Sequence, residues 1–233
     1  MSQATVTGAA RADSTVGTGA VGRVVGRGAR PLAATVLAGA VLAAVLTVWA
    51  HVGSAPDLDV LSMTISDFAV SNRGGPMERA MFVLGATSLA LPLGLRAVRA
   101  PVGRLPILLL LVWCFGLMAA AIVPTDPDPL VTELSTQGYV HRYVSVAAFV
   151  SLPVAVLVAV RRLAADPRWR SGLNRLRALA WVAVGGLVAL WWVAFPAERM
   201  MMGLVQRLLV TVEVVLLALF AARLYRVSGM PES

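Results

Sequence analysis

The sequence predicts an all-α, polytopic membrane protein, folded as a bundle of six transmembrane helices with both termini in the cytoplasm. Three observations predict this class. The 233 residues are 58% hydrophobic and 14% charged, whereas soluble domains carry about 25% charged residues. Six apolar runs are each long enough to cross a bilayer. The arginines are concentrated on one side of these runs.

Each element follows from the apolar pattern. Residues 1–30 are polar, rich in Gly, Ala and Thr, and lack an apolar period, so we expect a disordered cytoplasmic tail. The six-helix transmembrane domain is expected over residues 31–226, followed by a short cytoplasmic tail at 227–233. Backbone groups in lipid must form their hydrogen bonds internally, so the apolar runs should be helices. The expected spans are about 31–49, 77–98, 105–123, 141–160, 173–195 and 201–224.

The distribution of arginines orients the bundle. All 20 basic residues are arginine; with the N-terminus inside, 15 lie in inner segments, four lie in outer segments, and Arg207 lies within the sixth span. Loops that remain in the cytoplasm carry an excess of positive residues, so both termini are expected there. The Ala- and Val-rich composition without lysine is typical of a GC-rich bacterial genome. The expected location is therefore a bacterial plasma membrane.

The charge and cysteine content exclude several classes of function. The net charge of +8 comes from arginines in loops between spans, without alternating basic and aromatic residues, so no nucleic-acid surface is predicted. The arginine-rich inner loop at 161–177 instead suits anionic lipid headgroups. One cysteine, Cys114, and two histidines exclude an intramolecular disulfide and a cysteine-rich zinc site. We predict no metal site, and the sequence identifies neither a cofactor nor a protein partner.

The first outer loop, "LSMTISDFAVSNRGGPMER" at Leu61–Arg79, gathers hydroxyl and carboxylate groups. Ser62 and Ser66 are four residues apart, so a short re-entrant or interfacial helix would place them on one face. Asp67 follows directly. The alternative is a solvated loop in which these side chains only cap helices.

A rigid acidic segment, "IVPTDPDP" at Ile122–Pro129, ends the third span. Pro124 stops the helix, and the prolines restrict the residues before them to extended conformations. Thr125 and Asp126 can bond nearby backbone groups. The segment thus predicts a carboxylate with a fixed direction at the outer surface, or else a rigid turn that ties two helix ends together.

The fourth span opens with "GYVHRYVSV" at Gly138–Val146. His141 and Ser145 share a helical face because they are four residues apart, and Arg142 lies beside them. Such a histidine can act as a general base, a pH sensor or a metal ligand. The alternative is a histidine that only forms a hydrogen bond at a helix end.

The sixth span contains polar groups at membrane depth. Gln206 and Glu213 fall on one helical face and are expected to point into the bundle, and Arg207 lies within about two turns of the outer end. A carboxylate near mid-membrane is costly unless it is paired, protonated or facing water. Glu213 is therefore either a functional group or a protonated packing contact.

In chain order the sequence contains the motifs "SMTISDF", "GLR", "VPTDP", "DPRWR" and "GLVQRL". This order resembles that of a bacterial and archaeal family of integral membrane proteins, domain of unknown function 998. The likeness covers about residues 35–226, and its most specific part is the P-T-D-P motif followed by His141. The loop here reads Ser66-Asp67-Phe68-Ala69, where the family more often has Leu-Gly after the acidic residue. The resemblance implies a six-helix bundle and an outward polar cluster, without a reaction.

Three functions are compatible with these residues. The first is a non-enzymatic protein that binds a lipid or small ligand, or regulates a membrane partner, through an outer polar cluster. The second is an intramembrane lipid hydrolase or transferase using Asp126 and His141, with Ser66 and Asp67 as further catalytic candidates; no G-x-S-G signature supports it. The third is a small proton-coupled transporter using Glu213. The candidate ligand-binding residues are Ser62, Ser66, Asp67, Thr125, Asp126, His141, Arg142, Ser145, Gln206, Arg207 and Glu213.

Overall fold

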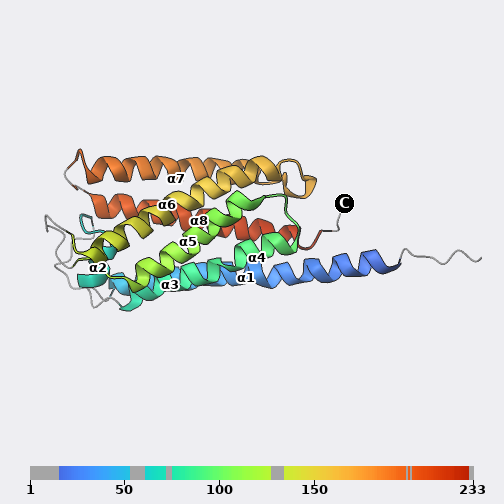
Figure 1. The fold of residues 1–233 in the computed structure, drawn as a ribbon, viewed down its shortest axis with the longest axis horizontal. Helices are drawn as coiled ribbons and strands as arrows, with labels where there is room; N and C mark the ends of the chain where they lie inside the picture. The colour runs from blue at the N-terminus through green and yellow to red at the C-terminus, as the bar shows by residue number, and fades with distance from the viewer. Residues whose placement is uncertain are drawn as a thin grey trace, which may run out of the picture.

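The computed structural model describes residues 16–52, 61–71, 75–126, 134–197, 199 and 201–230, with side chains from Gly28 onward except that of Ser71. Within these residues the fold is helical and contains no β-strand (Figure 1). The elements are α1 (Val16–Val52), α2 (Ile65–Ser71), α3 (Gly75–Ser88), α4 (Ala90–Ala97), α5 (Arg104–Ile122), α6 (Thr136–Leu163), the 3-10 helix η1 (Pro167–Trp169), α7 (Leu173–Ala194) and α8 (Met202–Val227).

Six helical segments are long and apolar enough to cross a membrane, which confirms the six predicted spans. Their ends differ from the predicted ones by a few residues, because several helices continue past their apolar part. The fourth span, for example, begins at Thr136 and not at His141. The segments are Gly28–Val52, Gly75–Ala97, Arg104–Ile122, Thr136–Leu163, Leu173–Ala194 and Met202–Val227.

The first helix begins earlier than the sequence suggested. α1 starts at Val16, so residues 16–30, for which we expected disorder, are helical, while residues 1–15 lie outside the described residues. Between Val16 and Arg30 the chain has no proline to stop a helix. Extending an existing helix also costs far less than nucleating one. The tail is therefore continuous with the first span.

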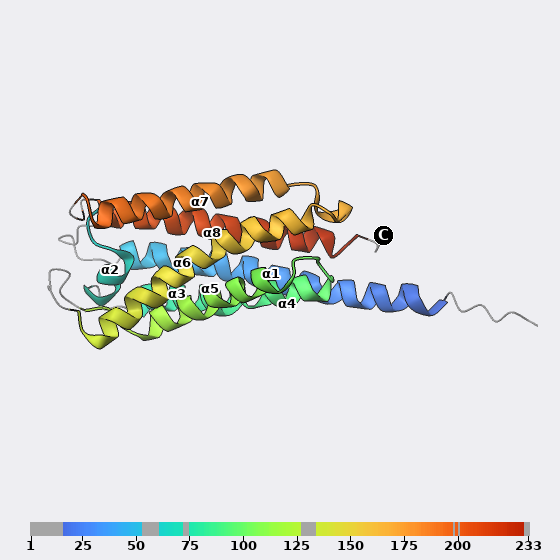
Figure 2. The same cartoon turned by 45° about the horizontal axis from the view of Figure 1, so that its top comes forward.

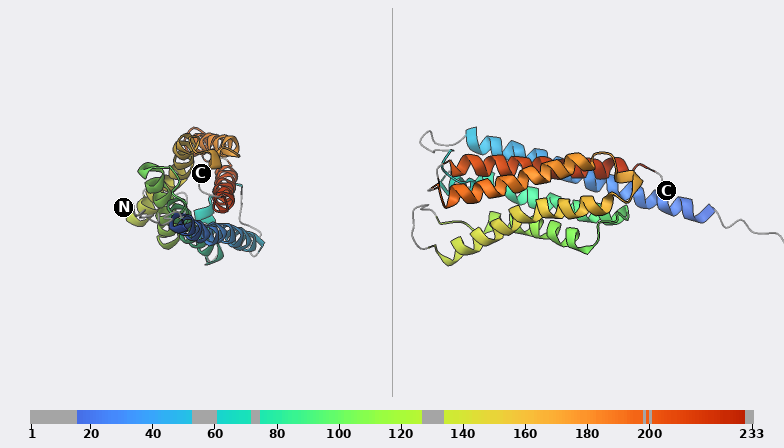
Figure 3. Two further views of the ribbon diagram at one scale, coloured as in Figure 1. Left: turned by 90° about the vertical axis from the view of Figure 1, so that its right-hand side faces the viewer. Right: turned by 90° about the horizontal axis from the view of Figure 1, so that it is seen from above.

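The six long helical segments form a ring in which each packs mainly against two neighbours, with smaller contacts of α8 to α6 and α4. The cyclic order is α1, then α3 with α4, α5, α6, α7, α8 and back to α1. Figures 2 and 3 show the helices running side by side along one axis, with consecutive colours following each other around the ring. Lipid-facing positions such as Val41, Val45 and Val188 are exposed, as expected for a bundle immersed in hydrocarbon.

The two ends of the bundle differ. The short helix α2 lies at one end, together with the end of α5 and the start of α6 (Figure 1). We call this the α2 end. The opposite end carries α4, η1 and the C-terminal end of α8, and α1 extends beyond the bundle there (Figure 1).

The second span is broken into α3 and α4 at Leu89. Pro92 has no N–H to donate to the carbonyl of Ser88, so one helical hydrogen bond is missing at this point. The hydroxyl of Thr87 donates to Val83 O at 2.7 Å and that of Ser88 to Leu84 O at 2.5 Å. Such back-bonding bends helices, so proline and hydroxyl side chains together account for the interruption.

Candidate functional site

The short helix α2 begins with a reciprocal cap. The hydroxyl of Thr64 accepts a hydrogen bond from the backbone N–H of Asp67 at 3.1 Å. The carboxylate of Asp67 accepts one from the backbone N–H of Thr64 at 3.2 Å. This arrangement satisfies donors at the start of a helix and defines where it begins. A short helix is therefore present, but it begins at Ile65, so Ser62 lies outside it and does not share a helical face with Ser66. Asp67 is a capping residue at its first turn.

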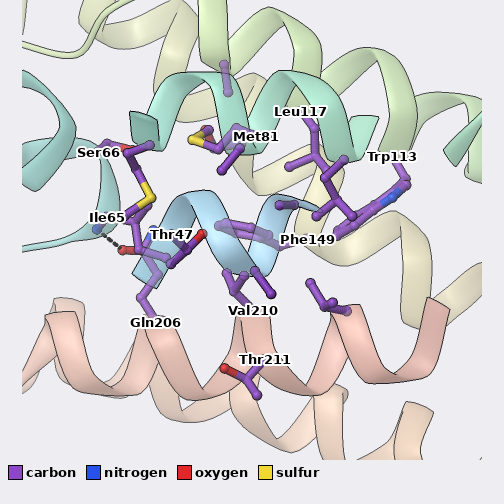
Figure 4. Close-up of a pocket in the computed structure, with 18 of the residues that line it drawn as sticks. Thr47, Ile65, Ser66, Met81, Trp113, Leu117, Phe149, Gln206, Val210 and Thr211 are labelled. Carbon is purple, nitrogen blue, oxygen red and sulfur yellow. Dashed lines mark hydrogen bonds between the residues drawn. The ribbon is translucent and has the colours of Figure 1, made fainter. Parts of the chain in front are cut away.

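Side chains from α8 hold the start of α2 against the bundle. The Gln206 side-chain oxygen accepts a hydrogen bond from the Ile65 backbone N–H at 2.7 Å (Figure 4). Arg207 donates from Nη1 to the carbonyl oxygen of Met63 at 2.7 Å and to that of Gly203 at 3.0 Å. These contacts give Gln206 and Arg207 a positioning role that their sequence positions alone did not reveal.

The guanidinium of Arg207 also joins a layered contact with α1. It donates from Nε to Nε2 of His51 at 3.1 Å, while Nδ1 of His51 lies 2.7 Å from the carbonyl oxygen of Thr47. The His51 ring stacks on Phe68 of α2 with centroids 4.7 Å apart, and the guanidinium lies over the same phenyl ring at 5.5 Å. This layer connects α1, α2 and α8. His51 was absent from our sequence-based candidates.

Ser66 and His141 meet at the α2 end. The Ser66 hydroxyl oxygen lies 2.8 Å from Nε2 of His141, and Nδ1 of His141 lies 2.7 Å from the carbonyl oxygen of Val123. A carbonyl oxygen only accepts, so Nδ1 carries the proton that it donates. In the neutral ring Nε2 then accepts from the Ser66 hydroxyl. The His141 side chain is buried, with 6% of its surface exposed.

The residues directly after α5 explain the orientation of the His141 ring. α5 ends at Ile122 and Val123 is extended, so the Val123 carbonyl leaves the helical hydrogen-bond pattern and is available to His141. The carboxylate of Asp126 accepts a hydrogen bond from the backbone N–H of Ser135 at 3.1 Å. The Ser135 hydroxyl in turn accepts from the N–H of Gly138 and caps α6. Among the described residues no hydrogen bond joins Asp126 to His141, and Asp126 ties the ends of α5 and α6 together.

The remaining predicted residues lie in different environments. Ser62 and Arg142 are exposed, and neither side chain joins the partly buried Ser66–His141 contact. Thr125 is half-buried beside Asp126. Glu213 is fully buried, and neither of its carboxylate oxygens has a hydrogen-bond partner among the described residues. As predicted, Gln206 and Glu213 both point into the bundle. In the part of the chain that is described, no group of three His, Cys, Asp or Glu side chains could hold a metal ion.

An apolar cavity of about 400 Å³ lies next to Ser66, between α1, α2, α3, α5, α6 and α8. Ile65, Ser66 and Gln206 lie toward one end of it, and Trp113 lies toward the other (Figure 4). Most of its lining is aliphatic or aromatic. Polar lining groups come from Thr47, Ser66, Ser145, Gln206 and Thr211, and the buried Ser145 hydroxyl has no hydrogen-bond partner among the described residues.

One wall of the cavity reaches the outside of the bundle. Ala44 and Val48 on α1, and Thr211 and Val215 on α8, line the cavity and are also exposed. Each pair is four residues apart and so occupies one face of its helix. The cavity therefore opens sideways between α1 and α8, toward the space that lipid occupies around a membrane-spanning bundle.

A ring of six apolar helices with a short helix at one end and a side-opening cavity defines a multi-pass membrane protein. The chain belongs to the family described as protein of unknown function (DUF998), whose model matches residues 12–223. This match confirms the resemblance drawn from the order of motifs. No curated protein and no solved structure matches the chain.

Proposed function

We propose that this protein binds one acyl chain of a membrane lipid in the cavity, with the lipid headgroup at the α2 end. The observation that carries this proposal is the apolar cavity of about 400 Å³ that opens sideways between α1 and α8. Ligand pockets have volumes of about 300–1,000 Å³ and combine an apolar lining with a few placed polar groups. The cavity has this composition.

The chemistry of the lining favours a hydrocarbon chain over a polar solute. Trp113, Leu117 and Phe149 contribute large apolar groups to the lining, and no charged side chain lines the cavity. Each buried CH₂ group contributes about 0.8 kcal/mol when it leaves water. In a bilayer that gain is absent, so the binding free energy would come from close contacts and from the polar groups at the α2 end. This favours a lipid with a hydrogen-bonding headgroup.

Native mass spectrometry of the protein released from lipid nanodiscs tests the proposal. We expect the wild-type protein to retain one lipid molecule. Ala80→Phe and Ala120→Phe add a phenyl group to two lining positions on α3 and α5, so both variants should lose at least about 90% of the retained lipid, which corresponds to roughly 1.4 kcal/mol of binding free energy.

The control is Ala147→Phe, which adds the same group to an exposed position on α6 outside the cavity lining. This variant should retain lipid as the wild type does. A wild-type protein without bound lipid, or equal retention in all three variants, would contradict the proposal.

We also propose that anionic headgroups bind the arginine-rich loop between α6 and α7. Arg161, Arg162, Arg170, Arg175 and Arg177 are exposed there, whereas Arg168 is engaged by Asp166. Basic residues near an anionic membrane surface contribute about 1 kcal/mol each. This contact is separate from the cavity, so neither proposal depends on the other.

A further inference from the structure

We propose that Ser66 and His141 form a nucleophile–base pair that cleaves an ester-linked acyl chain from a membrane lipid. The inference rests on the proposed function, because the acyl chain must occupy the cavity for its ester to reach Ser66. The substrate class is a lipid in which a fatty acid is joined to an alcohol through an oxygen ester.

The geometry of the pair is that of an activated nucleophile. The distance of 2.8 Å between the Ser66 hydroxyl oxygen and Nε2 of His141 lies within the hydrogen-bond range required for proton transfer. The Val123 carbonyl holds the proton on Nδ1 and so leaves the lone pair of Nε2 facing Ser66. The orienting group is thus a backbone carbonyl, where hydrolytic triads use a carboxylate.

Both members of the pair are held by neighbouring structure. Ser66 lies in the first turn of α2, whose start is fixed by Thr64, Asp67 and Gln206. His141 is buried near the start of α6 and is bonded through both ring nitrogens. A reactive pair must be positioned to within about 0.5 Å, and side chains fixed by surrounding contacts meet that requirement.

The position of Ser66 along the cavity fits an ester substrate. An acyl chain extending toward Trp113 would place its carbonyl, where the chain joins the headgroup, beside Ser66 and Gln206 (Figure 4). The Gln206 side-chain oxygen accepts from the Ile65 backbone N–H, so its amide NH₂ group takes no part in that bond. This NH₂ group has no acceptor among the described residues and would donate to the developing oxyanion.

The reaction balances with water as the co-reactant. The Ser66 oxygen attacks the acyl carbonyl carbon while its proton passes to Nε2 of His141. The ester C–O bond then breaks, and the alcohol leaves with that proton, which gives an acyl-Ser66 intermediate. Water loses a proton to Nε2 and attacks the same carbonyl carbon; the Ser66 oxygen leaves and recovers the proton. The products are a fatty acid and the de-acylated lipid.

The first experiment exposes the nanodisc-embedded protein to an alkyl fluorophosphonate, which phosphonylates activated serines. Peptide mass mapping of the wild-type protein should locate the adduct on Ser66. Ser66→Ala should abolish the adduct, and His141→Gln should slow its formation by about 100-fold or more. The matched control is Ser151→Ala on α6, a buried serine whose hydroxyl bonds the Ala148 carbonyl; it should react like the wild type. An adduct on another serine, or none, would overturn the pairing.

The second experiment measures turnover in nanodiscs that contain phosphatidylglycerol with oleoyl chains and phosphatidylethanolamine with palmitoyl chains. Free fatty acid should accumulate with the wild type and fall by at least about 100-fold with Ser66→Ala, and its chain identifies the headgroup of the donor. Native mass spectrometry of the same samples separates the two proposals. Retained lipid without an adduct or fatty acid would overturn the catalytic pair and leave lipid binding standing, whereas absence of retained lipid would overturn lipid binding.

Discussion

Single residues decide how the α2 end is built. Gly138 is one of them, because a Cβ atom at this position would lie 2.0 Å from the Asp126 carboxylate oxygen. Only glycine lets Asp126 reach the Ser135 N–H and close the connection from α5 to α6. Asp126 therefore acts as a tie between α5 and α6, and the carbonyl of Val123, not the carboxylate, orients His141.

The contribution of Asp166 to folding stability is expected to depend on pH. Its carboxylate caps η1 by accepting from the backbone N–H of Arg168, and it forms an ion pair with that guanidinium at 2.8 Å. The side-chain hydrogen bonds from Arg168 lower the pKa of the Asp166 carboxyl below its ordinary value of 3.8. A lowered pKa in the folded state means that the stabilisation is complete above the ordinary pKa and is lost as pH falls through the lowered one.

Asp166→Asn should therefore reduce the free energy of unfolding by about 0.2–1 kcal/mol at neutral pH, since asparagine can keep the cap but not the ion pair. The difference from the wild type should disappear at pH values below the lowered pKa of Asp166. Asp166→Ala should cost about 1 kcal/mol more, because it also removes the cap. Thermal unfolding in detergent across pH measures both effects. A difference that persists unchanged into strong acid would contradict the ionic contribution.

Small residues allow the helices to approach closely. A Cβ atom at Gly39 of α1 would lie 1.9 Å from the Thr87 hydroxyl of α3, and one at Gly85 of α3 would lie 2.7 Å from the Cys114 carbonyl of α5. Helices in lipid associate through such close backbone contacts, because hydrocarbon gives no hydrophobic driving force between them. The α1–α3–α5 side of the ring therefore depends on glycine.

Gly85→Ala should reduce the free energy of unfolding by about 1–3 kcal/mol, because the added methyl group meets backbone and forces α3 away from α5. The matched control is Gly185→Ala on α7, where no neighbouring atom lies within 4 Å of the added Cβ. That change should be neutral or stabilising by up to about 1 kcal/mol, since alanine favours helix over glycine. Unfolding of both variants in detergent tests this pair; similar losses in the two would show that close packing at Gly85 is unimportant.

At the scale of the molecule, the cyclic arrangement of helices makes the cavity possible. α1 and α8 are far apart in sequence but close the ring, and the cavity opens between their faces. An even number of spans also places both ends of the helical domain on one side of the membrane. The arginine distribution predicts that this side is the cytoplasm.

Cysteine labelling in intact bacterial cells tests that orientation. Cys114 is the only cysteine of the chain and is buried, so it gives little background. Gln137→Cys at the α2 end and Ser171→Cys between η1 and α7 introduce cysteines at exposed positions. A membrane-impermeant maleimide should label the first in intact cells and the second only after the membrane is disrupted. The opposite pattern would show that the bundle has the inverse orientation.

Many features of the site were predictable from local patterns. The presence of a short helix containing Ser66, the inward direction of Gln206 and Glu213, and the end of α5 just before Pro124 all follow from residue spacing and proline chemistry. The hydrogen-bond partners of the site residues could not be predicted from local patterns. Arg142 lies next to His141 in sequence but is exposed, whereas Ser66, 75 residues away, shares its hydrogen bond. His51 offered no local signal, since its contact with Arg207 joins the first and last helices.

The sequence alone was sufficient to predict the six spans, because a helix that crosses hydrocarbon needs a long uninterrupted apolar run, which can be recognised in the sequence. It was also sufficient to recognise the family, through the order of its motifs. The cavity and the Ser66–His141 contact depended on the folded bundle. Each depends on side chains from different helices, and their meeting is set by how the ring closes and not by the spacing of residues within one helix. For the same reason, Asp126 could be recognised in the sequence as a fixed carboxylate, but its partner, the N–H of Ser135, was visible only in three dimensions.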